Sequence, residues 1–145
     1  MKTKLDNSIN MILKNFNFLD TWILRFFLGV AFSIHGYQAL PLPSENLMKW
    51  FEFSPITASF VPISALFGGI VIIVSGFFSG AIGNLLTRIS GLVIVIYMIF
   101  AFSIAHQDWF ITSKLFVSEQ IFLFAIGLFF FLQGSSKGNK QNSFL

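Results

Sequence analysis

Apolar residues fall in four long runs along this chain, separated by short polar connections. The runs cover residues 22–40, 56–78, 85–105 and 115–133, and the last contains the polar triplet Ser118-Glu119-Gln120. A helix needs about 20 mostly apolar residues to cross a hydrocarbon core of about 30 Å. The pattern therefore predicts four membrane-spanning helices within residues 21–133. Because the connections are too short for a separate soluble domain, we expect one all-α, integral membrane four-helix bundle.

The two ends of the chain depart from this pattern. Residues 1–20 are mostly polar, yet several apolar side chains recur there at helical spacing. They are Leu5, Ile9, Ile12, Leu13 and Phe16. This stripe predicts a short amphipathic helix on the membrane surface, the alternative being an irregular tail. Residues 134–145 are rich in Gly, Ser, Asn and Lys, and we expect them to form a disordered polar tail.

The composition also indicates that lipid is the solvent for this chain. Among 145 residues, 55% are hydrophobic, 21 are Phe and only 10% are charged, whereas a soluble domain has about 25% charged residues. The chain has no Cys, which excludes disulfides, thiolate metal sites and iron–sulfur ligation. We therefore expect no metal site, and any redox chemistry must come from a cofactor or a partner. The nine Lys and Arg residues are too few for a nucleic-acid-binding surface.

Positive charges are distributed unevenly between the two sides of the predicted bundle. With alternating spans, both ends of the chain and the connection before residue 88 share one side, which has seven Lys and Arg residues. These are Lys2, Lys4, Lys14, Arg25, Arg88, Lys137 and Lys140. The opposite side has only Lys49 and Lys114. By the positive-inside rule we expect both termini in the cytoplasm and the protein in the inner membrane of a bacterium.

Polar residues inside the predicted spans are candidates for function, because ionisable groups are costly in hydrocarbon. The first and third spans run in the same direction, so His35 and His106 lie at similar depth, and Glu119 opens the fourth span from that side. Together with Gln38 they predict a polar cluster in which a neutral imidazole can hydrogen-bond a quinone or transfer a proton. The alternative is that these residues contact lipid headgroups, with Glu119 favouring the start of its helix. Haem b between the two histidines is the less favoured cofactor, since the chain has no other imidazole.

Small residues and one arginine mark the expected helix contacts. Arg25, Gly29 and Gly36 share one face of the first span at helical periodicity. The second span has two further stripes of small residues, which include Gly68, Gly69 and Gly76. Since small residues allow close helix approach, we interpret these glycines as packing contacts. Arg25, beside the glycine face, is a further candidate for ligand binding or proton transfer.

Several short motifs resemble the DoxX family of small four-helix membrane proteins. The segment Arg25-Phe26-Phe27-Leu28-Gly29, followed by His35-Gly36-Tyr37-Gln38, is similar to the first-helix signature of that family. Further positions follow in the family's order, namely Gly68-Gly69, Gly76, Thr87-Arg88, His106 and Glu119. The resemblance covers roughly residues 20–135.

This resemblance implies a membrane subunit that works with redox systems. Members of the family include membrane subunits of a thiosulfate:quinone oxidoreductase and components of membrane-bound oxidoreductase complexes. We therefore predict a quinone-linked or redox-partnered subunit with membrane or membrane-associated protein partners, and with His35, Gln38, His106 and Glu119 lining its site. The alternatives are a non-catalytic accessory or assembly subunit of a larger membrane complex, or a carrier for a small lipophilic molecule.

Overall fold

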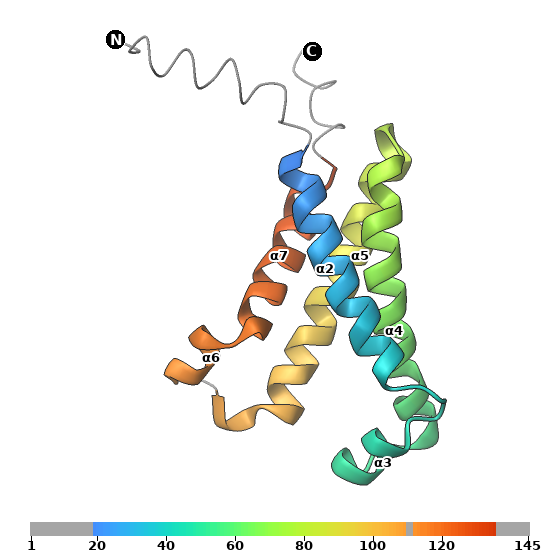
Figure 1. The fold of residues 1–145 in the computed structure, drawn as a ribbon, viewed down its shortest axis with the longest axis vertical. Coiled ribbons are helices and arrows are strands. Elements are labelled where there is room, and N and C mark those ends of the chain that lie inside the picture. The colour runs from blue at the N-terminus through green and yellow to red at the C-terminus, as the bar shows by residue number, and fades with distance from the viewer. Residues whose placement is uncertain (1–18, 110–111, 136–145) are drawn as a thin grey trace.

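The computed structural model describes residues 19–109 and 112–135, and this part of the chain is entirely helical outside its connections (Figure 1). Its long helices are α2 (Leu19–Gln38), α4 (Pro55–Val74), α5 (Gly80–Phe100) and α7 (Glu119–Gln133). The short ones are α3 (Glu45–Phe51), η1 (Ser75–Phe77), η2 (Ala101–Ala105), η3 (Gln107–Trp109) and α6 (Ser113–Val117). The expectation of an all-helical fold is confirmed. The predicted amphipathic helix and polar tail fall almost wholly outside the described residues.

The four long helices lie side by side and alternate in direction (Figure 1). α2 packs against α4, α4 against α5, and α5 against α7, while α2 also contacts α7. One end of the bundle holds the start of α2, the end of α7 and the turn between α4 and α5. We call it the arginine end, because Arg25 and Arg88 lie toward it. The opposite end, with α3, η3 and α6, is called the histidine end after His35 and His106.

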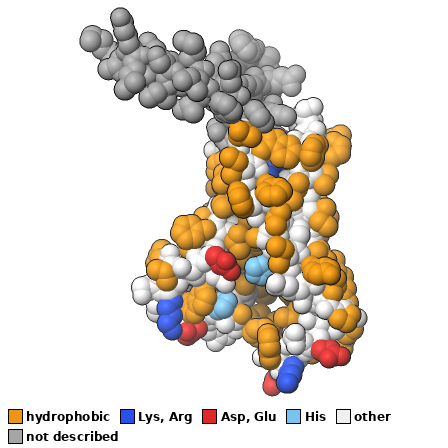
Figure 2. Space-filling model, viewed as in Figure 1, with side chains coloured by type: hydrophobic (Ala, Val, Ile, Leu, Met, Phe, Trp, Pro, Cys, Tyr) orange, Lys and Arg blue, Asp and Glu red, His pale blue; other side chains and the backbone are white. Residues whose placement is uncertain are grey.

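Among the residues that the structure describes, two helical segments are long and apolar enough to cross a membrane, Pro55–Phe77 with 23 residues and Gly80–Ala105 with 26. Only 39% of the most apolar window in each is buried, so the remaining side chains are partly or fully exposed. Figure 2 shows hydrophobic side chains spread over the visible face of the bundle. α2 is long enough to span but more polar. α7 has 15 residues, or about 22 Å at 1.5 Å per residue, against a hydrocarbon core of about 30 Å.

The observed helices differ from the predicted spans at their ends. α2 stops at Gln38 rather than at residue 40, because the chain turns toward Pro41, which cannot continue the helix. α5 begins at Gly80 rather than at residue 85, since Phe78 and Ser79 suffice for the turn that precedes it. The predicted span 115–133 is broken at Ser118, which has an extended backbone (φ −84°, ψ 148°) and separates α6 from α7.

Close contact between α2 and α4 depends on glycines. A Cβ atom on Gly29 would lie 2.6 Å from the backbone oxygen of Gly69. A Cβ atom on Gly36 would lie 2.7 Å from the backbone oxygen of Pro62. At both positions a side-chain carbon of α4, from Ile73 or Leu66, lies as close as these backbone oxygens. Because backbone atoms cannot rotate away, a side chain would have to push the two helices apart.

Gly69 meets the Gly29 backbone from the α4 side, whereas Gly68 and Gly76, also singled out in the sequence, face side chains. A Cβ atom on Gly68 would lie 3.1 Å from Cγ1 of Ile94 on α5. A Cβ atom on Gly76 would lie 3.1 Å from the indole ring of Trp22 on α2. Between the helices lies a core of buried apolar residues, which comprises Leu28, Phe32, Ala65, Ile72, Ile94, Met98, Phe102 and Phe130. These contacts connect α2, α4 and α5, and Phe130 joins α7 to the same core.

Candidate functional site

Arg25 lies in a buried polar network at the arginine end. Its side chain is only 2% exposed. Its Nη1 atom donates hydrogen bonds to the carbonyl of Ile72 at 3.0 Å and to the hydroxyl of Ser75 at 2.7 Å. The Thr87 hydroxyl lies 3.1 Å from Ser75 Oγ, and the Phe130 ring lies 4.7 Å from the guanidinium carbon. The network therefore connects α2 with the ends of α4 and α7 and with α5.

This environment is suited to holding helices together. The acceptors of Arg25 are a backbone carbonyl and a hydroxyl, and an aromatic face supplies a cation–π contact. Neither histidine is part of this network, because both lie at the opposite end of the bundle. The structure therefore separates Arg25 from the other polar residues that the sequence analysis grouped as site candidates.

His35 and His106 are brought together at the histidine end, where both line one cavity of about 160 Å³. Its wall comes from α2, α5, η2 and α7, and it also includes Phe32, Tyr97, Met98, Ala101, Ala105, Gln120 and Leu123. Figure 2 shows the histidine side chains on the same face of the molecule, beside a hollow between two lobes. An engineered cavity of about 150 Å³ in another protein holds one benzene molecule. The cavity therefore has room for a single six-membered ring and is far too small for a haem.

The hydrogen bonding of His35 defines what its imidazole can offer a ligand. Nδ1 lies 2.9 Å from the carbonyl oxygen of Ala31, one helical turn earlier. Because a carbonyl only accepts, Nδ1 carries a proton in this contact, and Nε2 of a neutral ring is then an acceptor. The side chain is exposed at this end of α2, and the Phe32 ring lies beside it with centroids 6.3 Å apart. His35 can thus accept a hydrogen bond from a hydroxyl group or take up its proton.

His106 is held by aromatic stacking where η2 leads into η3. Its ring stacks on the Trp109 indole with centroids 3.8 Å apart and an interplanar angle of 21°. The backbone supports this pair, since the Trp109 amide donates to the His106 carbonyl at 3.0 Å. An exposed ion pair between Lys114 and Asp108, 3.3 Å apart, lies in the same region. Stacking fixes the plane of the imidazole and leaves its edge available to the cavity.

Gln38 and Glu119 do not line the histidine cavity. Gln38 is the last residue of α2 and is exposed, as is Glu119 at the first position of α7. The residue after Glu119 lines the cavity instead, because consecutive helical positions are rotated by about 100°. Gln120 therefore occupies the place on α7 that the sequence analysis assigned to its acidic neighbour.

Gln120 and Tyr97 are the polar residues that the sequence analysis missed. Tyr97 lies in the middle of α5, with its ring edge-on to Phe32 at a centroid distance of 5.3 Å. A phenol in the apolar middle of the span was the available signal, because a buried hydroxyl usually has a partner. Gln120 had a weaker signal, since it lies close to the expected membrane interface.

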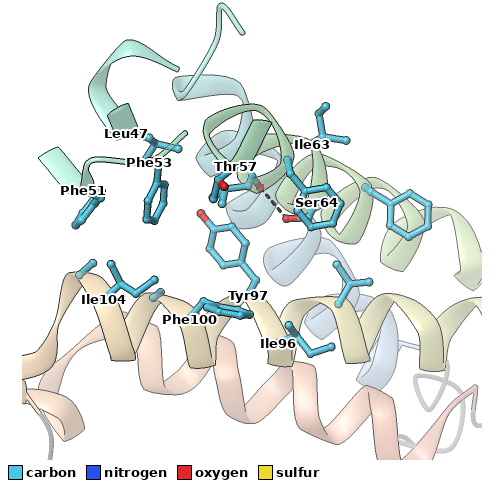
Figure 3. A pocket seen from close by; sticks show the side chains of 16 residues that line it. Leu47, Phe51, Phe53, Thr57, Ile63, Ser64, Ile96, Tyr97, Phe100 and Ile104 are labelled. Carbon is cyan, nitrogen blue, oxygen red and sulfur yellow. Dashed lines mark hydrogen bonds between the residues drawn. The ribbon is translucent and has the colours of Figure 1, made fainter. Parts of the chain in front are cut away.

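A larger apolar groove of about 550 Å³ lies between α3, α4 and the later part of α5 (Figure 3). Phe51 and Phe53 lie on its α3 side, and Ile96 and Phe100 on its α5 side. Figure 3 shows the Tyr97 hydroxyl pointing across the groove toward Thr57 and Ser64. The Ser64 hydroxyl already donates to the Val61 carbonyl at 2.7 Å, so the groove offers few free polar atoms.

The charges of the histidine end are mostly negative. Two lysines, Lys49 and Lys114, lie there with four carboxylates. These carboxylates belong to Glu45, Glu52, Asp108 and Glu119. Within residues 19–109 and 112–135, no group of three or more His, Asp and Glu side chains is placed to hold a metal ion. The polar groups that line the histidine cavity are the imidazoles of His35 and His106, the Gln120 amide and the Tyr97 phenol.

Comparison with known proteins gives one match. Residues 21–107 match the model of the DoxX family, which confirms the resemblance seen in the motifs of the first three spans. No curated protein and no solved structure gives a significant match. The matched region includes Arg25, His35 and His106 and ends just before η3 is complete.

Proposed function

This chain belongs to the DoxX family of membrane proteins, and on that basis we propose that it is a quinone-linked subunit of a membrane redox complex. The observation that carries the proposal is the cavity shared by His35 and His106. Its volume of about 160 Å³ matches one ring, and its polar groups come from three different helical segments. The ring of a quinone or hydroquinone is a ligand of this size and polarity.

The reduced form of the ligand fits the hydrogen bonding of His35 best. A hydroquinone hydroxyl is a donor, and the free Nε2 of neutral His35 is an acceptor. Oxidation to the quinone releases two electrons and two protons per ring. His35 is placed to accept one proton and the second passes to water at this exposed end, while the Gln120 amide can orient the ring from α7. The electrons pass to or from a partner redox protein, since this chain has no Cys with which to ligate an iron–sulfur cluster.

We also propose that all four long helices cross the inner membrane, with the arginine end facing the cytoplasm. α4 and α5 meet the length and apolarity that a span requires, and α2 and α7 pack alongside them. Leu19 and Ser135, the first and last described residues, lie at the arginine end, and the sequence beyond them contains five lysines. At the histidine end carboxylates outnumber lysines. This bias favours cytoplasmic termini by the positive-inside rule. The histidine cavity then lies toward the outer face, within reach of quinones dissolved in the bilayer.

The test is binding of a hydroquinone without a hydrocarbon tail to the purified protein in nanodiscs, measured by quenching of tryptophan fluorescence. His35→Ala and His106→Ala should each weaken binding about tenfold, which is the loss of about one hydrogen bond. Ser103→Ala is the matched control. The Ser103 hydroxyl is exposed at the same end, donates a hydrogen bond to the Ile99 carbonyl one turn earlier and does not line the cavity. Equal affinity in all four proteins would refute a ring site at the histidines.

One observation favours a second function, that of a non-catalytic accessory or assembly subunit. Both imidazoles already have partners within their own segments, Ala31 for His35 and Trp109 for His106. Neither therefore requires a ligand for its polar or aromatic contacts. Copurification from native membranes in mild detergent would identify the complex. Full complementation of that complex by both histidine variants would establish the accessory function in place of the quinone-linked one.

A further inference from the structure

The histidine cavity and the apolar groove adjoin along one strip of α5 and η2. Tyr97, Ala101 and Ala105 line both of them. Since these residues are four positions apart, they follow one another along one face of the helix. The strip ends in η2, a π-helical turn, and π-helical turns occur frequently at functional sites. A molecule longer than one ring can therefore lie in both spaces only by passing over this strip.

The groove has the chemistry of a site for hydrocarbon. Its lining is apolar except for a few hydroxyl groups, and its phenylalanines come from α3, α4 and α5. Its volume of about 550 Å³ lies within the range of about 300–1,000 Å³ found for small-molecule sites. Figure 3 shows side chains from both sides of the groove facing one another across it. The space suits a flexible chain of methylene or isoprenoid units rather than a polar solute.

We propose that the groove holds the hydrocarbon tail of the ligand whose ring occupies the histidine cavity. This inference rests on the proposed function, and it specifies the ligand further as an amphiphile with one polar ring and one long apolar tail. The shared border favours this occupant over a separate lipid, because Tyr97, Ala101 and Ala105 line both spaces. The tail leaves the ring over Ala101 and Ala105 and extends between α4 and α5.

The small side chains of Ala101 and Ala105 leave room for the tail to pass from the histidine cavity into the groove. Each has only a methyl group where most neighbours on η2 and the end of α5 are bulky, among them Phe100, Phe102 and Ile104. A leucine at position 101 adds a branched side chain at the border of the two spaces. A leucine in place of Ser64 would instead fill the groove from α4, away from the histidine cavity. The two substitutions therefore obstruct the tail from different helices.

The experiment compares two benzohydroquinones in nanodiscs, one with a decyl chain on the ring and one with a methyl group in its place. The measured quantity is the tail ratio, defined as the dissociation constant of the methyl compound divided by that of the decyl compound. Ala101→Leu and Ser64→Leu should each lower the tail ratio about tenfold, since the added carbons displace methylene groups from the groove. Ser64→Leu should leave the affinity of the methyl compound unchanged. Ala81→Leu is the matched control, an exposed alanine at the other end of α5 that lines neither space.

The outcomes separate this inference from the proposed function. A tail ratio that stays at the wild-type value in both groove variants, with helical content and elution volume preserved, would overturn the tail site while leaving the ring site intact. A methyl compound that binds no more weakly to His35→Ala and His106→Ala than to the wild type would overturn the ring site, and the tail inference with it. A ratio lowered in Ala101→Leu and Ser64→Leu but not in Ala81→Leu would establish the groove as the tail site.

Discussion

The two ends of the bundle are built from the same four helices but differ in how their polar side chains are bonded. At the arginine end, a 2%-exposed guanidinium has its acceptors and an aromatic face supplied by neighbouring helices. At the histidine end, both imidazoles border a cavity, and a groove opens between α4 and α5. At the arginine end the polar side chains form contacts between helices. At the histidine end the two imidazoles border an open cavity instead.

This difference indicates which polar residues of a helical membrane protein are available for ligands. A polar group in hydrocarbon must find a partner, and Arg25 finds its partners in other helices. His35 finds its partner in its own helix, so removing the side chain would disturb no other element. A residue satisfied within its own segment can be changed or engaged by a ligand at little cost to the fold.

The largest expected effect is a difference in cysteine labelling between the two ends, with one end labelled in intact cells and the other not. The native chain has no Cys, so a single cysteine reports its position without background. Ser113→Cys lies at the histidine end and Ser79→Cys at the arginine end, and both positions are exposed. A membrane-impermeant maleimide added to intact cells should label Ser113→Cys alone, with Ser79→Cys labelled only after permeabilisation. The reverse pattern would contradict the proposed orientation.

The second-largest effect is the loss of stability expected when a side chain is introduced at a glycine in the contact between α2 and α4. Gly36→Leu should lower the free energy of unfolding by about 3 kcal/mol, because the new Cβ meets the Pro62 carbonyl and α2 must move from α4. Thermal unfolding in detergent measures the loss. Ala125→Leu, on an exposed position of α7, is the control and should change stability by less than about 0.5 kcal/mol. An unchanged melting temperature for Gly36→Leu would mean that α2 and α4 are not in close contact there.

A smaller loss is expected from removing the buried guanidinium. Arg25→Met should lower the free energy of unfolding by about 2 kcal/mol, since it removes charged hydrogen bonds to two acceptors and the contact with Phe130. Arg88→Met should lose less, about 1 kcal/mol, because Arg88 is only partly buried and donates to one carbonyl, that of Phe131. The same unfolding measurement compares them. An Arg25→Met protein as stable as the wild type would show that burying this charge costs as much as its contacts return.

The smallest effect on stability is expected at the histidine end. His35→Ala should change the free energy of unfolding by less than about 1 kcal/mol, because the ring is exposed and its hydrogen bond lies within one turn of α2. Unfolding should be measured on the same preparation that is used for hydroquinone binding. A loss as large as that of Arg25→Met would make His35 a structural residue, and the contrast between the two ends would then disappear.

Several features of this fold could be predicted from the sequence because they depend on local pattern. Long apolar runs predicted the helices and their order, and helical periodicity placed Gly29 and Gly36 on one face of α2. Topology alone put His35 and His106 at the same end, since two parallel helices end at similar depth. The break at Ser118 and the start of α5 at Gly80 were not predicted, because apolar content does not distinguish a helix from the turn beside it.

The sequence by itself determined the solvent of this protein, its all-helical class and which polar residues had to be explained, since hydropathy and periodicity are properties of the chain. Only the tertiary structure decided what each polar residue does. It gave Arg25 acceptors about fifty positions away in the chain, and it turned Gln120 rather than Glu119 toward the cavity. It also placed Tyr97 between two spaces that no local pattern describes. The physical reason is that cavities and buried hydrogen bonds are made between helices, so they depend on how the helices are rotated and spaced.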